Sequence, residues 1–461
     1  MHSYIDDLFK AATKLRGKVS PADYKYYVLT LVFLRHISKQ ECNKTWENIV
    51  NISKYMQVTD KSIGQYIDEE LNKIVKTHNF NNQFQGIFSN SNIKNSTLVE
   101  LIELINDIKL ENYGGDYLGK VYEYFIGNFA ASEGNRGGEF FTPKSVVDLL
   151  VKMLKPISGT IYDPACGTGG IFVETRNETA RNIKLKFIGQ EQNSKTVFLA
   201  FMNAKLHNLD LDIKCGDTLL NDLNPELKAD YIISNPPFNM KDWGSEQLSE
   251  DDPRIISSIN KNNANYMWIQ HFIYHMAENG HAGFVISNGA LTSTNKSDCE
   301  TRKIIMQNNL LDCVVQLPDK MFFGTAIPSA LVFFSKTRKT KDNVLFIDAS
   351  QYGKLISKTQ KELSPEDIDK VATLYNYYKN NKDINYNKDG FSAAISVKKI
   401  EDNEYKILPS YYVGVEKEVV NHEENNEKIK ILNKKLLKQL DETKIVSLKL
   451  KQLLSEEQYD I

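Results

Sequence analysis

An apolar run meets two consecutive prolines in Tyr231-Ile232-Ile233-Ser234-Asn235-Pro236-Pro237-Phe238. The run predicts a buried strand, and because proline cannot donate to a sheet ladder, the chain must leave the sheet there, at the carboxyl edge. Open α/β sheets bind their ligands at this edge. The side-chain oxygen of Asn235 and the carbonyl of Pro236 are acceptors that together fit the two N–H donors of an exocyclic amine, and Phe238 can stack on the ring that carries it. The alternative for this tetrapeptide by itself is a strand end with a proline turn and a core phenylalanine.

Short β-rich runs alternate with helical runs from Thr160 onward. Such alternation predicts an α/β fold with a doubly wound, mostly parallel, Rossmann-like sheet and right-handed crossovers. The expected strands are 160–162, 187–189, 211–214, 231–234, 283–287, 313–316, 330–335 and 344–348. The expected helices include one that is capped by Thr142-Pro143 and runs to Leu154, and others at 197–206, 267–277 and after Ser364-Pro365.

The N-terminal region differs from the sheet region in its periodicity. Residues 1–131 show helical periodicity and almost no strand signal, which predicts an all-α N-terminal domain. A glycine-rich stretch at 132–138 separates it from the α/β domain, which we place at 138–350 with a C-terminal extension at 351–415. Helices of the N-terminal domain are expected after Ser20-Pro21, over 98–108 and over 117–129.

Residues 416–461 form a predicted C-terminal helical tail. The tail is rich in Lys, Glu and Leu, and Ile429, Leu432, Leu436 and Leu440 recur at helical spacing. A long amphipathic helix with no core to cover predicts a coiled coil or a helix that binds a partner subunit. An ordinary packed helix is the alternative, because the heptads are not sustained.

The composition excludes several classes of protein. Of 461 residues, 41% are hydrophobic and 25% are charged, as in soluble globular proteins. Five cysteines without a CxxC pair argue against a disulfide framework or a zinc site, and they fit a reducing cytoplasm. No apolar stretch approaches the roughly 20 residues that span a bilayer, and the polar N-terminus does not resemble a signal peptide.

The charge balance limits how the chain can bind nucleic acid. With 57 basic and 59 acidic residues the net charge is −2, unlike that of a protein that binds DNA by charge alone. Any DNA binding must therefore use a partner or local basic patches. The candidate patches are 336–341 and Lys398-Lys399.

Polar or glycine-rich motifs follow four successive predicted strands. The first is Asp163-Pro164-Ala165-Cys166-Gly167-Thr168-Gly169-Gly170, whose glycines let a ligand approach the backbone and the free amides of the next helix. Glu191 ends the second strand, where an acidic side chain can hold a ribose diol, and Asp217 follows the third, where it can accept from an adenine amine. Neither GxGxxG nor GxxxxGK[ST] spacing occurs, so a nucleoside cofactor without phosphates fits better than a dinucleotide or ATP.

With these motifs the chain resembles the modification (methyltransferase) subunits of type I restriction-modification systems, which are adenine-N6 DNA methyltransferases. The resemblance implies a methyltransferase sheet that uses S-adenosyl-L-methionine, with Ala165, Cys166, Gly167 and Gly169 at its methionine end. It also implies that Glu191 holds the ribose hydroxyls, that Asp217 meets the cofactor's adenine, and that the target adenine binds at the Asn-Pro-Pro-Phe motif. The implied cofactor-binding set is Glu139, Phe140, Phe141, Thr142, Pro143, Lys144, Asp163, Ala165, Cys166, Gly167, Gly169, Glu191 and Asp217, and the implied catalytic set is Asn235, Pro236, Pro237 and Phe238.

The family chemistry also implies a route for the reaction. Acceptors at Asn235 and Pro236 direct the lone pair of the adenine amine toward the methyl group, and the leaving group is a neutral thioether, so no metal is implied. An adenine inside a duplex is out of reach, so the base is expected to be flipped out and stacked on Phe238.

The expected partners are double-stranded DNA and a separate specificity subunit, because no target-recognition domain is evident in the sequence. Two modification subunits per specificity subunit and a further restriction subunit fit the family pattern, in the cytoplasm and without a membrane. The alternatives are a methyltransferase that acts on protein glutamine or RNA amino groups, and a non-catalytic scaffold that binds S-adenosylmethionine.

Overall fold

The computed structural model describes residues 24–54, 62–78, 86–91, 93–107, 119, 122, 142–180, 182–322, 327–415 and 422–456. The chain divides into two compact units, Met1–Gly414 and Val415–Ile461. The predicted cap at Ser20-Pro21, the glycine-rich stretch and most of the predicted helix at 117–129 lie outside the described residues. In the part of the chain that is described, no helix combines the length and the apolar character needed to cross a membrane.

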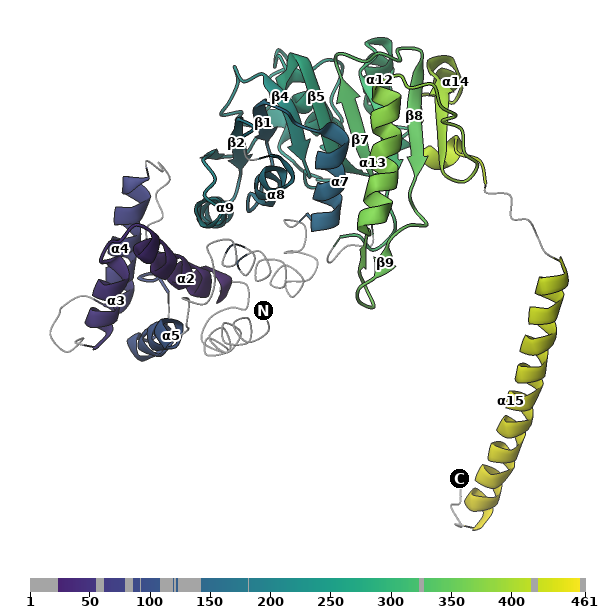
Figure 1. Ribbon diagram of the computed structural model, residues 1–461, viewed down its shortest axis with the longest axis horizontal. Helices are drawn as coiled ribbons and strands as arrows, with labels where there is room; N and C mark the ends of the chain where they lie inside the picture. The colour runs from purple at the N-terminus through teal and green to yellow at the C-terminus, as the bar shows by residue number, and fades with distance from the viewer. Residues whose placement is uncertain are drawn as a thin grey trace. The chain divides into compact units, whose positions relative to one another are not determined.

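A nine-stranded, mostly parallel sheet forms the centre of the first unit (Figure 1). Its strands are in the order β11-β8-β6-β7-β5-β4-β1-β2-β3. Strand β7 runs antiparallel to both β5 and β6, and the edge strand β11 runs antiparallel to β8. The predicted doubly wound sheet is therefore confirmed. Its strands are β1 (Gly159–Asp163), β2 (Leu185–Glu191), β3 (Leu211–Cys215), β4 (Ala229–Ser234), β5 (Met276–Ser287), β6 (Leu311–Gln316), β7 (Ser329–Ser335), β8 (Asn343–Asp348) and β11 (Ser392–Ser396).

Helices cover both faces of the sheet because successive strand residues point to opposite sides. In β4, Tyr231 and Ile233 pack into one hydrophobic cluster, and Ile232 packs into the other. The first cluster contains α7 (Lys144–Leu154), α8 (Gly170–Glu178), α9 (Ser194–Leu206) and α13 (Pro365–Lys379). The second contains α10 (Asn265–His275), α11 (Asn288–Leu291), α12 (Lys296–Gln307) and α14 (Val397–Asp402).

Several predicted boundaries were wrong. The helix expected at 267–277 ends at His275, because β5 already begins at Met276, which pairs with Ala229 of β4. Strand β11 and the small hairpin of β9 (Lys354–Leu355) and β10 (Lys361–Glu362) were not predicted. The predicted cap of α7 was also wrong in detail, since the N-cap is Pro143 and no side chain caps the helix.

The described helices before the sheet belong to the same unit. They are α2 (Tyr24–Gln40), α3 (Thr45–Lys54), α4 (Ile63–Thr77) and α5 (Asn95–Asp107). Their apolar residues continue the hydrophobic cluster of the first sheet face, and Phe33 of α2 packs edge-on against Phe201 of α9 at 5.9 Å between ring centroids. No described residue of this region lies in a strand, as the sequence predicted.

The second unit contains one long helix, α15 (His422–Glu456). The predicted long helix is thus confirmed, although its function is not tested by the fold. The described apolar side chains of α15 are exposed, including Leu432 at 63%, Leu436 at 55% and Leu440 at 50%.

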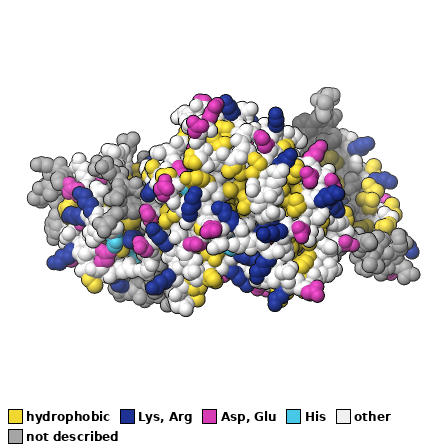
Figure 2. Space-filling model, turned by 90° about the horizontal axis from the view of Figure 1, so that it is seen from above, with side chains coloured by type: hydrophobic (Ala, Val, Ile, Leu, Met, Phe, Trp, Pro, Cys, Tyr) yellow, Lys and Arg dark blue, Asp and Glu magenta, His cyan; other side chains and the backbone are white. Residues whose placement is uncertain are grey.

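Basic and acidic side chains are interspersed over the face of the molecule seen in Figure 2. The basic run at 336–341 is not a free basic patch, because Arg338 is buried and its Nε donates to Asp312 at 3.2 Å. The run follows β7, which is antiparallel to β4 and β1 in sense, so it emerges at the opposite edge from the ends of those strands. This candidate for DNA binding was therefore wrong.

Candidate active site

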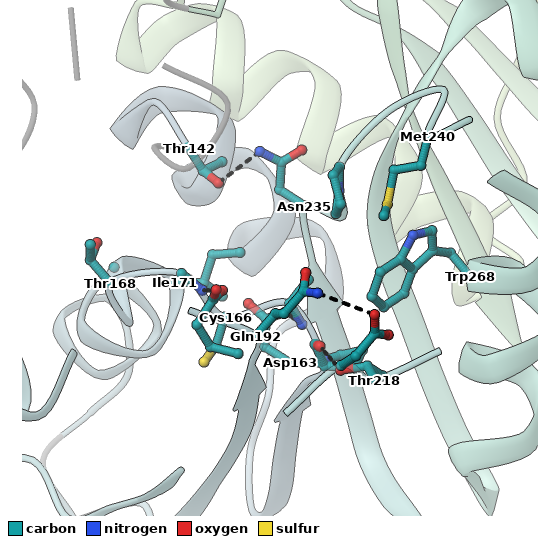
Figure 3. A pocket seen from close by; sticks show the side chains of 17 residues that line it. Thr142, Asp163, Cys166, Thr168, Ile171, Gln192, Thr218, Asn235, Met240 and Trp268 are labelled. Carbon is teal, nitrogen blue, oxygen red and sulfur yellow. Dashed lines mark hydrogen bonds between the residues drawn. The ribbon is translucent and has the colours of Figure 1, made fainter. Parts of the chain in front are cut away.

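A pocket lies at the carboxyl edge of the sheet, beside the point where the strand order reverses (Figure 3). From β1 the chain winds through β2 to β3 on one side, and β4 and β5 lie on the other. Such a reversal is where doubly wound sheets bind ligands. The pocket is lined by Thr142, Asp163, Pro164, Ala165, Cys166, Gly167, Thr168, Gly170, Ile171, Glu191, Gln192, Asp217, Thr218, Asn235, Pro237, Met240 and Trp268.

The glycine-rich turn after β1 is held from behind by the next strand. Gly167 and Gly169 have φ of 53° and 74°, which side chains with a Cβ adopt rarely. The amide of Gly167 donates to Glu191 Oε2 at 3.1 Å, and Oε1 of the same carboxylate accepts from the amide of Asn193 at 2.8 Å. Burial raises the pKa of Glu191, and these backbone hydrogen bonds oppose that effect. Glu191 thus fixes the turn and also lines the pocket.

Asp163 at the end of β1 has one oxygen paired and one unpaired. Its Oδ1 accepts from the hydroxyl of Ser234 at 2.7 Å and from the amide of Ala165 at 3.0 Å. Its Oδ2 is buried and has no hydrogen-bond partner among the described residues. Burial raises the pKa of Asp163 to about 7, against these two hydrogen bonds. The pocket wall therefore holds a buried acceptor that a cationic donor would satisfy.

The segment after β3 is fixed by hydrogen bonds to Asp217 and from Arg254. Asp217 Oδ1 accepts from the amides of Leu219 and Leu220 at 3.0 and 3.2 Å, and Oδ2 accepts from Gln192 at 3.2 Å. The buried guanidinium of Arg254 donates to the carbonyl of Thr218 at 2.8 Å and to that of Leu219 at 2.7 Å. The outer oxygen of Asp217 is bonded only to a flexible, exposed side chain in this arrangement, so a ligand can compete for it.

Asn235 stands at the end of β4 with an unpaired acceptor. Its Nδ2 donates to Thr142 Oγ1 at 3.1 Å, whereas its buried Oδ1 has no partner in the described part of the chain. The carbonyl of the buried Pro236 likewise accepts no backbone amide from the described residues. The hydroxyl of Thr142, which the sequence assigned to a helix cap, thus orients the Asn235 amide instead.

Asn239 anchors the turn that contains Asn235. Its backbone is in the left-handed region, at φ 54°, and its Oδ1 accepts from Asn265 at 2.9 Å and from Ser287 at 3.2 Å. Its amide donates to Asn265 Oδ1 at 2.9 Å. These bonds join the turn to α10 and to the end of β5, so the position of Asn235 is set by two neighbouring elements.

The pocket brings together most, but not all, of the residues singled out from the sequence. Thr142, Asp163, Ala165, Cys166, Gly167, Glu191, Asp217, Asn235 and Pro237 line it. Pro143, Lys144, Gly169, Pro236 and Phe238 do not line it, and Glu139, Phe140 and Phe141 lie outside the described residues.

Two of the residues off the pocket wall have other partners. The ammonium of Lys144 pairs with Glu174 at 2.5 Å and Asp148 at 3.0 Å. Phe238 packs edge-on against Phe322, with 5.9 Å between the ring centroids. Both contacts hold these side chains beside the pocket rather than in it.

Sequence reasoning missed several lining residues. Gln192 and Thr218 directly follow Glu191 and Asp217, so the same strand-end rule could have included them. Trp268 is different, because it comes from the middle of α10 and its neighbours look like ordinary core residues. Its Nε1 is buried and has no hydrogen-bond partner among the described residues, so it is a further unsatisfied polar group of the pocket.

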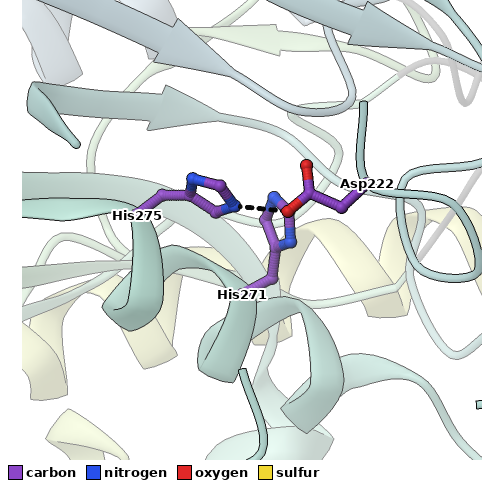
Figure 4. A group of neighbouring side chains, drawn as sticks. All are labelled: Asp222, His271 and His275. Carbon is purple, nitrogen blue, oxygen red and sulfur yellow. Dashed lines mark hydrogen bonds and ion pairs between the residues drawn. The ribbon is translucent and has the colours of Figure 1, made fainter. Parts of the chain in front are cut away.

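Asp222, His271 and His275 come close enough together behind the pocket to ligate a metal ion (Figure 4). Their hydrogen bonds favour an ion pair instead. His275 faces the carbonyl of Leu227 with Nδ1 and the carboxylate of Asp222 with Nε2, both at 2.9 Å. Because both partners are acceptors, both ring nitrogens must donate, and His275 is positively charged.

His271 differs from its neighbour in charge. Its Nδ1 lies 3.3 Å from Nη1 of Arg254, which can only donate, so Nδ1 accepts and the ring is neutral. Burial and the nearby charges of His275 and Arg254 hold the pKa of His271 well below its usual value. The cluster therefore joins α10, which carries Trp268, to the segment that follows Asp217.

The chain matches the family model of N-6 DNA Methylase over residues 113–421 and that of the HsdM N-terminal domain over residues 6–105. It is 32% identical to the type I restriction enzyme MjaIX methylase subunit of Methanocaldococcus jannaschii, over 97% of this chain and 90% of that protein. It is 36% identical to the type I restriction enzyme HindI methylase subunit of Haemophilus influenzae, over 76% of this chain and 83% of that protein. A solved type I restriction-modification system methyltransferase subunit from Streptococcus thermophilus shares the fold, with a TM-score of 0.70 at 24% identity over 90% of this chain and 99% of that one.

The ion pair behind the pocket predicts a measurable coupling. His275→Ala leaves a largely buried carboxylate without its partner, and we expect it to lower the free energy of unfolding by about 3–5 kcal/mol in urea denaturation. Asp222→Ala removes the other charge and is expected to be destabilising as well. Because each single variant strands a charge, the double variant should lose less than the sum of the two, by about 1 kcal/mol or more. Strictly additive losses would contradict the pair.

Proposed function

The chain belongs to the N-6 DNA methylase family, as a methylase subunit of the type I restriction enzymes, and from this premise we propose that its pocket binds S-adenosylmethionine next to a flipped-out adenine. The chain is an S-adenosylmethionine-dependent DNA adenine-N6 methyltransferase by this membership. The proposal concerns which side chains hold each group. It rests on two buried acceptors in one pocket, Asp163 Oδ2 and Asn235 Oδ1, that have no partner among the described residues.

The cofactor half of the pocket is the part built on the ends of β1, β2 and β3. Its donors and acceptors fit a methionine nucleoside, because Asp163 Oδ2 suits an ammonium group, Glu191 can still accept from ribose hydroxyls, and Asp217 can accept from an adenine amine. Glycines at 167 and 169 leave the backbone open to the methionine end. When bound, S-adenosylmethionine supplies a methyl group on a positively charged sulfur.

The target half of the pocket is built on the end of β4. Asn235 Oδ1 and the Pro236 carbonyl accept from the adenine amine, which directs its lone pair out of conjugation with the ring. Thr142 holds the Asn235 amide in place for this task. Extruding the base costs a few kcal/mol of unstacking, and Phe238, beside the pocket, is the aromatic residue that can stack on it. Fixed positions and aligned acceptors supply most of the rate.

Two alternatives are separated by where the methyl group goes. A methyltransferase of protein glutamine or RNA is disfavoured because the matched family is one of DNA methylases and covers residues 113–421. A non-catalytic scaffold is disfavoured by the unsatisfied acceptor of Asn235, which has no structural task. Incubation of the complex with methyl-labelled cofactor distinguishes label in DNA, in protein or RNA, or in none of these.

The exposed apolar side chains of α15 fit a role in subunit assembly. We place a specificity subunit there, because a helix with this many exposed leucines is stabilised by helices of a partner. That subunit selects the DNA sequence, with two methylase subunits per specificity subunit, and a restriction subunit is a further possible component. Membership among type I restriction enzyme subunits supports an assembly of this kind.

Asn235→Ala should abolish most methyl transfer and leave cofactor affinity nearly unchanged. Loss of one aligned group in an active site typically lowers kcat by about 10²–10³-fold. Single-turnover transfer of labelled methyl to DNA measures the first effect, and calorimetry measures the second. Asn308→Ala, on the exposed end of α12, serves as the matched control. Retained activity in Asn235→Ala would remove this residue from the catalytic role.

Cofactor affinity should depend on the protonation of Asp163. The carboxyl has a pKa of about 7 and can pair with an ammonium group only when ionised, so affinity should rise as the pH increases through about 7. Asp163→Asn cannot ionise, and its affinity should be lower at high pH and lack this inflection. Calorimetric titrations over a pH series test the difference. Parallel pH profiles for the two proteins would exclude contact between Asp163 and the ammonium group.

Deletion of residues 420–461 should abolish co-purification with the specificity subunit. Cofactor binding should persist, because the pocket lies in the unit that ends at Gly414. A finer test replaces Leu432 and Leu436 by serine and compares this variant with serine at Lys434 and Lys435 of the same helix. Only the leucine variant should release the partner. An intact complex after the full deletion would refute the assignment.

A further inference from the structure

A small hairpin projects from the sheet on the side where the pocket opens. It consists of β9 and β10, which pair Leu355 with Lys361 and Lys354 with Glu362. The hairpin follows β8, and β8 runs parallel to β6 and in the same sense as β1 and β4. Its strand therefore ends at the carboxyl edge, as β1 and β4 do. Figure 1 shows β9 protruding beyond the end of α13 at this edge.

Contacts at the base of the hairpin place it beside the target half of the pocket. The amide of Leu363, directly after β10, donates to the hydroxyl of Ser145 at 3.4 Å. Ser145 lies in the first turn of α7, three residues after Thr142, which holds Asn235. One side of the hairpin base is thus joined to the residue that orients the proposed amine acceptor.

The other side of the base is joined to the turn that follows β6. The amide of Lys361 donates to the carbonyl of Lys320 at 2.9 Å, and its ammonium pairs with Asp319. Two residues further along this turn, Phe322 packs against Phe238. The hairpin is therefore bracketed by contacts that lead to Asn235 and to Phe238, the two side chains proposed to handle the target base.

The tip of the hairpin has a composition that no intramolecular contact explains. All residues at 354–359 are exposed, including the apolar side chains of Leu355 at 61% and Ile356 at 57%. The flanking Lys354 and Lys358 form no ion pair with any described residue, and this segment contains no acidic residue. An apolar tip between cations matches elements that contact DNA phosphates and place aliphatic side chains against base steps.

We propose that the hairpin at 354–362 contacts the DNA duplex next to the target adenine, with Lys354 and Lys358 at phosphates and Leu355 and Ile356 against the bases beside the vacated position. This inference rests on the proposed function, because only a base that leaves the helix creates such a position. Phosphate contacts add affinity without sequence preference, whereas the aliphatic tip stabilises the opened duplex.

The test uses the full chain in complex with its specificity subunit and a duplex that carries the site mapped by modification sequencing. Lys354→Ala/Lys358→Ala should weaken DNA binding and lower the slope of log K against log salt by about 2, close to 0.9 for each lost phosphate contact. Leu355→Ser/Ile356→Ser should leave that slope unchanged. It should reduce the fluorescence of 2-aminopurine at the target position and the rate of methyl transfer by several-fold.

Matched controls lie at the opposite edge of the sheet. Lys339→Ala/Lys341→Ala removes two exposed charges after β7, and Ile157→Ser removes an exposed aliphatic side chain before β1. Neither control should change the salt slope, the fluorescence or the rate. Unchanged cofactor affinity in all four variants shows that each one is folded.

The outcomes separate this inference from the function on which it rests. Hairpin variants that match the wild-type complex in salt slope and fluorescence, while that complex methylates DNA, overturn the hairpin contact alone. Release of the specificity subunit by either hairpin variant overturns it in favour of a protein contact. A wild-type complex that transfers no methyl group to DNA overturns the proposed function, and the hairpin contact with it.

Discussion

The hydrogen bond from Ser234 to Asp163 joins the two strand ends between which the sheet changes direction, and the pocket depends on it. From β1 the chain winds through β2 and β3, whereas β4 and β5 extend the sheet the other way. Helices therefore leave these two strands on opposite faces, and no crossover covers the gap at their carboxyl ends. The bond keeps the two strand ends in register, so that groups carried by different strands face one shared space. Both proposed ligands are bound in that space.

Polar groups behind the pocket are paired, whereas several that face it are not. Arg254 and Asn239 each make multiple hydrogen bonds that fix the loops after β3 and β4. In contrast, the buried oxygens of Asp163 and Asn235 and the indole N–H of Trp268 lack partners among the described residues. Unpaired buried groups are destabilising, so their concentration in one place indicates that a ligand completes them. Rigid support behind unsatisfied groups is the arrangement that fixed-geometry catalysis requires.

The sequence predicted the sheet well because its strands are continuous apolar runs, and it failed where that signal is absent. Strands β9 and β10 have two residues each, and β11 consists of small residues, so none of them gives a hydrophobic pattern. The strand-end rule found Glu191 and Asn235 because topology alone brings such residues to one edge. It could not find Trp268, which enters the pocket from a helix through packing. Nor could it foresee that carboxylates of α7 and α8 would bind Lys144, since that pairing depends on how two helices meet.

The double engagement of Glu191 limits how cofactor preference can be redesigned. The same carboxylate lines the pocket and accepts from the backbone of the glycine turn and from the start of α9. Replacing it to admit a synthetic analogue with a bulkier sugar would release the loop that shapes the opposite wall, so selectivity and scaffold integrity are inseparable at this position. Gln192, next to it, is exposed and contributes no backbone support of this kind. Engineering of orthogonal cofactors in this scaffold should therefore begin at the neighbour rather than at the anchor.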